Sequence, residues 1–265
     1  MSNRIENKFK QLKSRKKKAF IAYVTAGDPN LKTTEELVLS FAKAGVDIVE
    51  LGVPFSDPMA DGPTIQAGSQ RALKSGTNLP KIFQLVKRIR RKSEIPIAFM
   101  TYYNPVFHYG EAAFIRDAKK AGVDGLIFPD LPPQEAPDLR RLAQQANIAM
   151  VFLLAPTTTK ERIKPIAQAS SGFIYYVSLA GVTGERKALS KNIYENVRAA
   201  KCLTHKPVCV GFGISTPAQA KSVAKAADGI IVGSAIVKQI EKNLGKRDLV
   251  KNVTRFVQKL ARAVN

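Results

Sequence analysis

The amino-acid sequence predicts an α/β fold, a single (β/α)₈ TIM barrel over residues 1–265 with an extra N-terminal helix. Two observations lead to this prediction. Short apolar runs and amphipathic helical segments alternate eight times along the 265 residues, which matches the size of a closed barrel. The apolar runs also show no alternation with polar residues, which is typical of parallel strands buried on both faces.

Each strand is predicted from a continuous apolar run, and each helix from apolar residues at helical spacing. Two of the helices stop at Gly45 and Gly122, because glycine favours the left-handed turn that closes a helix. The predicted strands are 19–24, 46–51, 95–101, 125–128, 149–154, 173–178, 208–210 and 229–232. The predicted helices are 2–12, 33–44, 63–75, 79–92, 111–121, 135–146, 160–169, 192–203, 216–227 and one or more within 235–264.

A short internal repetition supports the barrel. Residues 44–47 read Ala-Gly-Val-Asp, and the same four residues recur at 121–124, each time where a helix ends and a strand begins. An open, doubly wound sheet is the alternative. That fold usually carries a Gly-x-Gly-x-x-Gly turn after an early strand, whereas the first strand here runs into 25–28, Thr-Ala-Gly-Asp.

The chain is strongly basic, with 42 Lys and Arg against 21 Asp and Glu and a formal net charge of +21. The densest basic clusters, 15–18 and 87–92, are not interleaved with aromatic residues as in proteins that bind single-stranded nucleic acid. No helix-turn-helix, zinc-finger or RNA-binding motif is present. We therefore expect a solvated basic surface and no specific nucleic-acid partner.

The composition also predicts the compartment. No apolar run is long enough to span a bilayer, and the basic N-terminus lacks the apolar segment of a secretory signal. We expect no membrane association and a cytoplasmic location. Cys202 and Cys209 lack metal-ligand spacing and are expected to be reduced thiols in the core. His108 and His205 share no motif, so no metal site is expected.

The loop after the second strand, residues 50–63, is rich in Pro, Gly and Asp. Glu50 stands where the strand ends, and Asp57 and Asp61 follow in the loop. Because the neighbours of Glu50 are apolar, its carboxyl should be partly buried, and it then needs a partner or a shifted pKa. Barrel active sites lie at the C-terminal ends of the strands, so these acids are candidates for catalysis. An ordinary solvated loop is the alternative.

Aromatic and apolar residues are expected at the same rim. A rim of this composition suits a flat apolar ligand, although Met100 and Phe128 could equally be barrel filling. The rim residues are Tyr23, Met100, Tyr102, Phe128 and Phe212, with Tyr175 inside the sixth strand.

Three glycine-rich turns follow the last three strands, at 181–184, 211–213 and 233–234. Glycine lets the backbone approach a ligand and present its N–H groups. The last turn directly precedes a helix, whose N-terminus favours an anion. Barrels commonly bind phosphate after strands 7 and 8, so we expect a phosphate site here.

The remaining chemistry points to carboxylates. The fourth and sixth strands carry no lysine that could form a Schiff base, which argues against a lysine-dependent aldolase. Ser178 and Thr183 have no base nearby in the sequence, so a nucleophilic triad is not supported. Acid–base catalysis by carboxyl groups is what remains.

Six motifs make the chain resemble the tryptophan synthase alpha subunit family over essentially its whole length. They lie at 23–29, 50–58, 60–66, 129–132, 181–184 and 211–214, and the second and third together are highly specific. The resemblance implies cleavage of indole-3-glycerol phosphate to indole and D-glyceraldehyde 3-phosphate in L-tryptophan biosynthesis. It also implies a partner, the beta subunit, which carries pyridoxal phosphate in an αββα assembly, and no cofactor in this chain.

The resemblance further implies residue roles. Glu50 would act as general acid and base, and Asp61 would hold the indole N–H and stabilise positive charge on the ring. Tyr102 would lie near the reacting end, and Tyr175 beside the glycerol phosphate. The apolar pocket would consist of Tyr23, Ile65, Met100, Phe128 and Phe212. The phosphate contacts would be Gly184, Gly213, Gly233 and Ser234.

Two loops resemble mobile ones. The loop 54–61 would touch the beta subunit, and 179–190 would be a lid whose Thr183 reaches Asp61 on closure. We therefore expect the isolated chain to be slow until the loops order. Two other functions are kept open. One is another phosphate-binding barrel, such as a sugar-phosphate isomerase or indole-glycerol-phosphate synthase, although the synthase would need a lysine at a strand end. The other is a basic binding protein with salt-sensitive nucleic-acid affinity.

Overall fold

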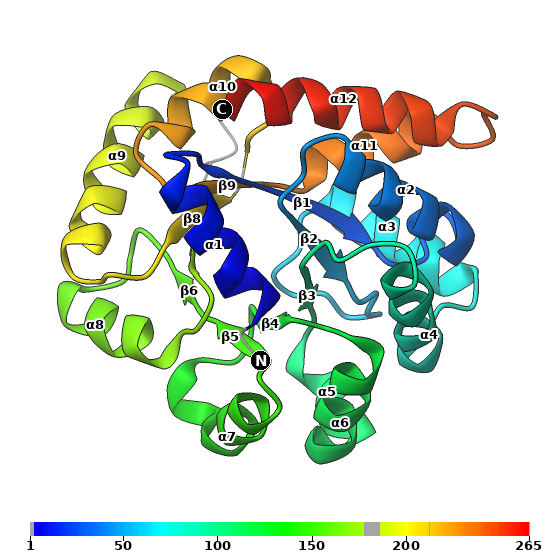
Figure 1. The fold of residues 1–265 in the computed structure, drawn as a ribbon, viewed down its shortest axis with the longest axis horizontal. Helices are drawn as coiled ribbons and strands as arrows, with labels where there is room; N and C mark the ends of the chain where they lie inside the picture. The colour runs from blue at the N-terminus through cyan, green and yellow to red at the C-terminus, as the bar shows by residue number, and fades with distance from the viewer. Residues whose placement is uncertain (1–2, 178–185, 212, 265) are drawn as a thin grey trace.

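A computed structural model describes residues 3–177, 186–211 and 213–264, and its strands form one parallel sheet surrounded by helices (Figure 1). The strands are β1 Ala19–Thr25, β2 Ile48–Gly52, β3 Ile97–Met100, β4 Gly125–Ile127, β5 Ala149–Val151, β6 Leu153–Leu154, β7 Ile174–Val177, β8 Val208–Gly211 and β9 Gly229–Val232. Their order is β5-β4-β3-β2-β1-β9-β8-β7-β6, so neighbours in the sheet are mostly neighbours in the chain.

The two ends of the sheet meet at Phe152, and this closes the barrel. β5 pairs with β4 and β6 pairs with β7, and the two are halves of the single strand predicted at 149–154. The backbone N–H of Tyr175 donates to the carbonyl of Phe152 over 3.1 Å, which continues the hydrogen bonding across the break. The prediction of a closed barrel is confirmed, and the open sheet is excluded.

The helices agree with the predicted alternation, with local differences. Residues 103–109, for which the sequence predicts neither a strand nor a helix, form a helix. Pro105 lies in its first turn, where its missing N–H removes no helical hydrogen bond. The final helical region is two helices, and the helix predicted from 192 begins at Arg186. The helices are α1 Arg4–Ser14, α2 Leu31–Lys43, α3 Pro63–Lys74, α4 Leu79–Arg90, α5 Tyr103–Tyr109, α6 Glu111–Ala121, α7 Pro137–Gln145, α8 Lys160–Ala169, α9 Arg186–Cys202, α10 Pro217–Ala224, α11 Ser234–Lys242 and α12 Leu249–Val264, with a short 3₁₀ turn at Pro133–Glu135.

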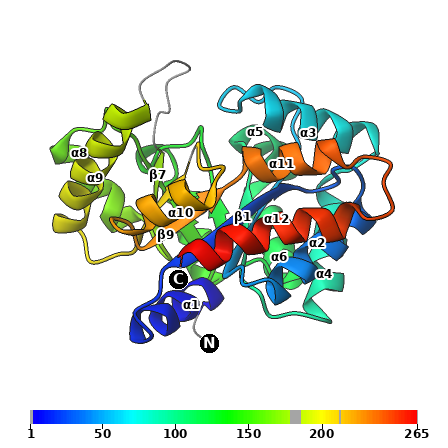
Figure 2. The ribbon, with the colours of Figure 1, turned by 90° about the horizontal axis from the view of Figure 1, so that it is seen from above.

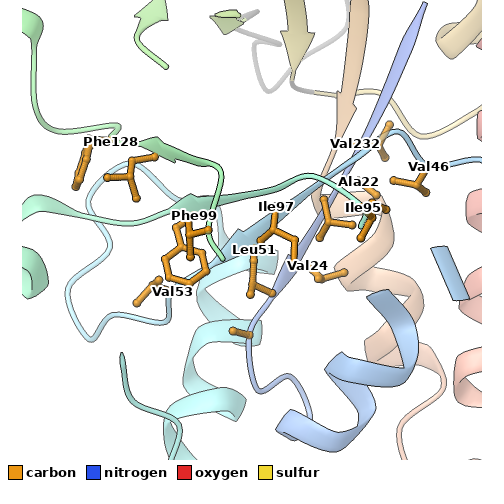
Figure 3. Close-up of a cluster of buried hydrophobic side chains, with 14 of the residues drawn as sticks. Ala22, Val24, Val46, Leu51, Val53, Ile95, Ile97, Phe99, Phe128 and Val232 are labelled. Carbon is orange, nitrogen blue, oxygen red and sulfur yellow. The ribbon is translucent and has the colours of Figure 1, made fainter. Parts of the chain in front are cut away.

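The main core lies between the strands and the surrounding helices. Alternate residues of β1, such as Ala22 and Val24, face this layer together with Leu51 of β2 and Phe99 of β3. Figure 3 shows these side chains meeting outside the sheet. This packing holds each strand from outside, so the C-terminal ends of the strands are placed by the main core of the protein.

The strand residues that alternate with those of the main core face the barrel interior. Ile21, Ile48 and Ile231 pack there against Ile5 and other side chains of α1. Helix α1, the predicted N-terminal helix, lies at the end of the barrel where the strands begin (Figure 2). It closes that end, which leaves the opposite end as the mouth.

The helices and the two cysteines bear on the expectations drawn from composition. Within the described ranges, no helix is long and apolar enough to cross a membrane. Cys209 is buried, as expected for a core thiol, but Cys202 is exposed, so the prediction of two core thiols is wrong for Cys202. Cys202 is the last residue of α9, whereas Cys209 lies within the buried strand β8.

Candidate active site

Glu50 points into the barrel from the middle of β2. Side chains alternate along a strand, so Glu50 shares the inward face with Ile48, which packs in the interior. The parallel register places Glu50 between Tyr23 of β1 and Ala98 of β3. The carboxyl thus has a tyrosine on one side and a small alanine on the other, on the inward face of the barrel.

The carboxyl of Glu50 is buried, and one of its two oxygens lacks a hydrogen-bond partner in the described part of the chain. The residue is 1% exposed, and that oxygen is Oε2. Burial, and secondly the nearby Asp61 carboxylate, raise the pKa of Glu50 from 4.5 to about 8. At neutral pH Glu50 therefore holds a proton that it can donate.

Asp61 lies in the loop between β2 and α3, and Tyr102 holds that loop in place. Burial raises the pKa of Asp61 from 3.8 to about 6, and a hydrogen bond from the Tyr102 phenol opposes the rise. The Tyr102 hydroxyl also accepts from the backbone N–H of Ala60 over 2.9 Å. The ring of Phe55 lies against that of Tyr102, with 5.5 Å between centroids. Tyr102 thus ties both arms of the loop to the N-terminus of α5.

The two carboxyl groups therefore divide into an acid and an anion. At pH 7 Glu50 is mostly protonated and Asp61 mostly ionised. Different environments that separate two pKa values in this way are typical of paired acid–base residues. Within the described ranges, no group of three or more His, Cys, Asp or Glu side chains is placed to hold a metal ion.

The rings of Tyr23 and Tyr175 each pack directly against a glycine of a neighbouring strand. A Cβ atom on Gly52 would overlap the phenol of Tyr23, and one on Gly211 would overlap that of Tyr175. Burial, and then the charge of Glu50, raise the pKa of Tyr175, so its hydroxyl stays protonated beside Glu50. We did not single out Gly52 from the sequence, although its position two residues after Glu50 at a strand end was a usable signal.

A small apolar cluster lines the mouth next to Glu50. Tyr23, Ile65 and Met100 pack there with Val237 of α11, so three predicted pocket residues come together. Phe128 does not join them. It follows the inward-facing Ile127 and therefore faces the helices, where it is 2% exposed in the main core (Figure 3).

A buried ion pair supports α3, the helix that carries Ile65. Asp28, 0% exposed, receives two hydrogen bonds from the guanidinium of Arg71, over 2.8 and 2.9 Å. Burial raises the pKa of Asp28, and Arg71 opposes that rise. No local sequence pattern signals this pair, because 43 residues separate its members.

The predicted phosphate residues lie where β8 and β9, neighbours in the sheet, end. Gly213 has a left-handed backbone with φ +74° and is exposed, as is Ser234, the first residue of α11. Gly233 precedes α11 as its N-cap. The free N–H groups of a first helical turn attract anions. Gly184, Thr183 and Phe212, and most of the predicted lid, lie outside the described residues.

Comparison with known proteins gives one consistent result. The family model for the tryptophan synthase alpha chain matches residues 9–265. A tryptophan synthase alpha chain from Geotalea daltonii is 54% identical over 243 residues, covering 92% of each chain. One from Citrifermentans bemidjiense is 51% identical over 262 residues, covering 99% of this chain and 98% of the relative.

Solved structures agree in fold. The tryptophan synthase subunit alpha from Legionella pneumophila has a TM-score of 0.93 at 37% identity, covering 100% of this chain and 99% of that one. A chain of tryptophan synthase from M. tuberculosis has a TM-score of 0.89 at 33% identity, with the same coverage. Since the match extends over the whole barrel and includes the loops that carry both carboxylates, the chain belongs to the tryptophan synthase alpha chain family.

Proposed function

We propose that this chain is a carbon–carbon lyase that cleaves indole-3-glycerol phosphate into indole and D-glyceraldehyde 3-phosphate, as the alpha subunit of a cytoplasmic tryptophan synthase. The observation that carries the proposal is the buried carboxyl of Glu50, with its unpartnered Oε2 and a pKa of about 8, beside the ionised Asp61. Membership of the family supports the same activity.

The proposed substrate pose follows from the two halves of the mouth. The indole ring would lie on the apolar cluster of Tyr23, Ile65 and Met100. The phosphate would bind at Gly213, Gly233 and Ser234, with Gly184 completing the site and Tyr175 beside the glycerol chain. An apolar ring at one end and an anion at the other match the composition of these two surfaces.

The proposed reaction uses each carboxyl in its favoured state. Protonated Glu50 donates its proton to the indole ring carbon that bears the glycerol chain, which leaves positive charge on the ring. Asp61 accepts a hydrogen bond from the indole N–H and stabilises that charge. The glycerol hydroxyl next to the ring then loses its proton to Glu50 as the carbon–carbon bond breaks. The bond's electrons return to the ring, which releases indole and an aldehyde.

The partner would be the beta subunit, and pyridoxal phosphate would be held there rather than in this chain. Two apolar side chains near the mouth support a docking face: Met59, 92% exposed in the Asp61 loop, and Phe107, 68% exposed on α5. Tyr102 joins these two segments through its bond to Ala60. A partner on this face would press on the Asp61 loop, so we expect binding to speed cleavage.

Indole release from indole-3-glycerol phosphate tests the proposal. Purified chain should release indole, and a tryptophan synthase beta subunit should increase the rate. Asp61→Asn should lower the rate at least ~100-fold, the low end of what acid–base and charge-stabilising groups contribute.

Asp57→Asn is the matched control, since Asp57 is an exposed aspartate in the same loop. It should be compared in the isolated chain, because an exposed residue of this loop is available to the partner. No indole from the wild type, even with the partner, would refute the proposal, as would equal losses in the two variants.

A further inference from the structure

A second cavity lies at the end of the barrel away from the candidate active site, where the strands begin. Its volume is about 440 Å³. One wall is the end of α1 and the turn after it, with Lys13, Lys16 and Lys17, and the other is the segment 204–207 that leads into β8. Phe9 and Leu12, both buried, form an apolar floor.

The lining is strongly cationic. Six lysines line the cavity against a single carboxylate, that of Asp228: Lys13, Lys16, Lys17, Lys18, Lys201 and Lys206. Asp228 is already engaged by Lys201 over 2.6 Å and by Lys18 over 3.9 Å. Lys13, Lys16 and Lys17 form no ion pair in the part of the chain that the structure describes. Ion pairs therefore leave most of this positive charge unneutralised, although Lys17 also acts on Asp47, where burial raises the pKa of the carboxyl and the charge of Lys17 opposes that rise.

The ammonium group of Lys206 is already engaged by the fold. It donates to the backbone carbonyl of Ser170, which lines a neighbouring cavity together with Glu6 and Arg140. Burial lowers the pKa of Lys206, Glu6 opposes that change, and the positive charge of Arg140 lowers it further. The charge available to a ligand in this cavity therefore comes chiefly from Lys13, Lys16 and Lys17.

Lys16 occupies a backbone position that normally suits glycine. Its φ is +54°, in the left-handed region, and its N–H donates to the carbonyl of Lys13 over 3.1 Å. The N–H of Lys17 donates to the carbonyl of Leu12 over 2.9 Å, which completes the closing turn of α1. A side chain here is strained where glycine would not be. The turn therefore presents a lysine to the cavity at some loss of stability.

We propose that this cavity binds the phosphate chain of a small polyphosphate. Lysines on two walls of one cavity can contact several phosphate groups of one ligand. The cavity's volume of about 440 Å³ and its apolar floor favour a small ligand over a nucleic-acid backbone, and the phenyl ring in the lining, that of Phe9, is buried and cannot stack on a base. The site is independent of the chemistry at the mouth.

Titration calorimetry with sodium tripolyphosphate tests the proposal on the full chain at about 0.15 M salt. One equivalent should bind per chain. The triple variant Lys13→Gln, Lys16→Gln, Lys17→Gln should bind roughly tenfold more weakly, because three exposed ion pairs of about 0.5 kcal/mol each are lost. The triple variant Lys74→Gln, Lys119→Gln, Lys120→Gln is the matched control. It removes the same charge from exposed lysines in the last turns of α3 and α6, and should bind like the wild type.

Three results would overturn the proposal: no binding, equal weakening in both triple variants, or a random DNA duplex that binds more tightly than tripolyphosphate and depends on the same lysines. Adenosine triphosphate distinguishes the two sources of a polyphosphate chain. If adenosine triphosphate binds at least as tightly as tripolyphosphate, the cavity is assigned to nucleotides. If it binds more weakly, the cavity is assigned to free polyphosphate. Both results support the proposal.

Lys16→Gly separates binding from folding. The variant should unfold at a higher temperature, because glycine removes the backbone strain, and should bind tripolyphosphate more weakly. A purely structural role for Lys16 would leave binding unchanged, which would contradict its part in the site.

Discussion

The buried carboxyl of Glu50 makes the stability of the chain depend on pH, and Glu50→Gln isolates that dependence. The pKa of Glu50 is about 8 in the folded chain, against 4.5 for an ordinary glutamate. Below pH 4.5 the side chain is protonated in both folded and unfolded states. Between pH 4.5 and about 8 only the unfolded state loses the proton, so stability falls as pH rises. Above about pH 8 both states are ionised and the loss is complete.

The size of the effect follows from the same two pKa values. A difference of one pH unit corresponds to about 1.4 kcal/mol, so the gap between 4.5 and about 8 corresponds to at most about 5 kcal/mol. Glutamine has nearly the same shape and no charge, and whatever its amide gains or loses in the site is the same at every pH. The stability difference between Glu50→Gln and wild type should therefore grow in favour of the variant by up to about 5 kcal/mol.

Urea unfolding at about pH 5 and about pH 8.5 measures this change. Glu36→Gln is the control, because Glu36 is an exposed glutamate on α2, and its stability difference from wild type should be the same at both pH values. If the difference for Glu50→Gln also stayed constant, the carboxyl would not be held protonated by the fold, and the assigned acid role would lose its physical basis.

Three further substitutions test the surroundings of the site. Gly52→Ala should destabilise the chain by about 1–3 kcal/mol in urea unfolding, because its Cβ would overlap the Tyr23 phenol; an unchanged midpoint would mean that the ring moves freely. Arg71→Met should cost roughly 3–5 kcal/mol at neutral pH by leaving Asp28 buried and unpaired, and less in acid, where that carboxyl is protonated; a loss independent of pH would contradict the charge argument. Tyr102→Phe removes a hydrogen bond that holds down the pKa of the loop aspartate, so the acid limb of the indole-release profile should move to higher pH, and an unmoved limb would contradict the pairing.

The sequence was sufficient for features that depend on local patterns. Strand runs without alternation and glycine stops at Gly45 and Gly122 led to a closed barrel, and both glycines have left-handed backbones in the structure. The burial of Glu50 was predictable from its apolar neighbours. Both faces of such a strand are covered by apolar side chains, so an acidic residue within it is buried whichever face it occupies. No helix is predicted over α5, because a proline such as Pro105 disfavours a helix interior, whereas in the structure it lies in the first helical turn, where it is tolerated.

Features that depend on contacts between distant parts of the chain could not be predicted from local sequence patterns. The bond between Tyr102 and Ala60 joins residues 42 positions apart, and no local pattern signals it. The direction in which the side chain of Phe128 points was equally hard to predict. It is predicted as the last residue of the strand 125–128 and lies one residue beyond the end of β4, but whether it faces the mouth or the helices depends on the register of that strand. One residue of difference reverses the side to which a strand residue points.

The measurement that tests the central claim most directly is indole release by Glu50→Gln in the presence of the beta subunit. The claim is that the proton held by Glu50 is the one transferred in the reaction. Substrate should still bind, because the apolar cluster and the phosphate residues are intact, but the turnover rate should fall by about 10³-fold or more. A variant that kept turnover within about tenfold of wild type would show that another group moves the proton, and would contradict the account.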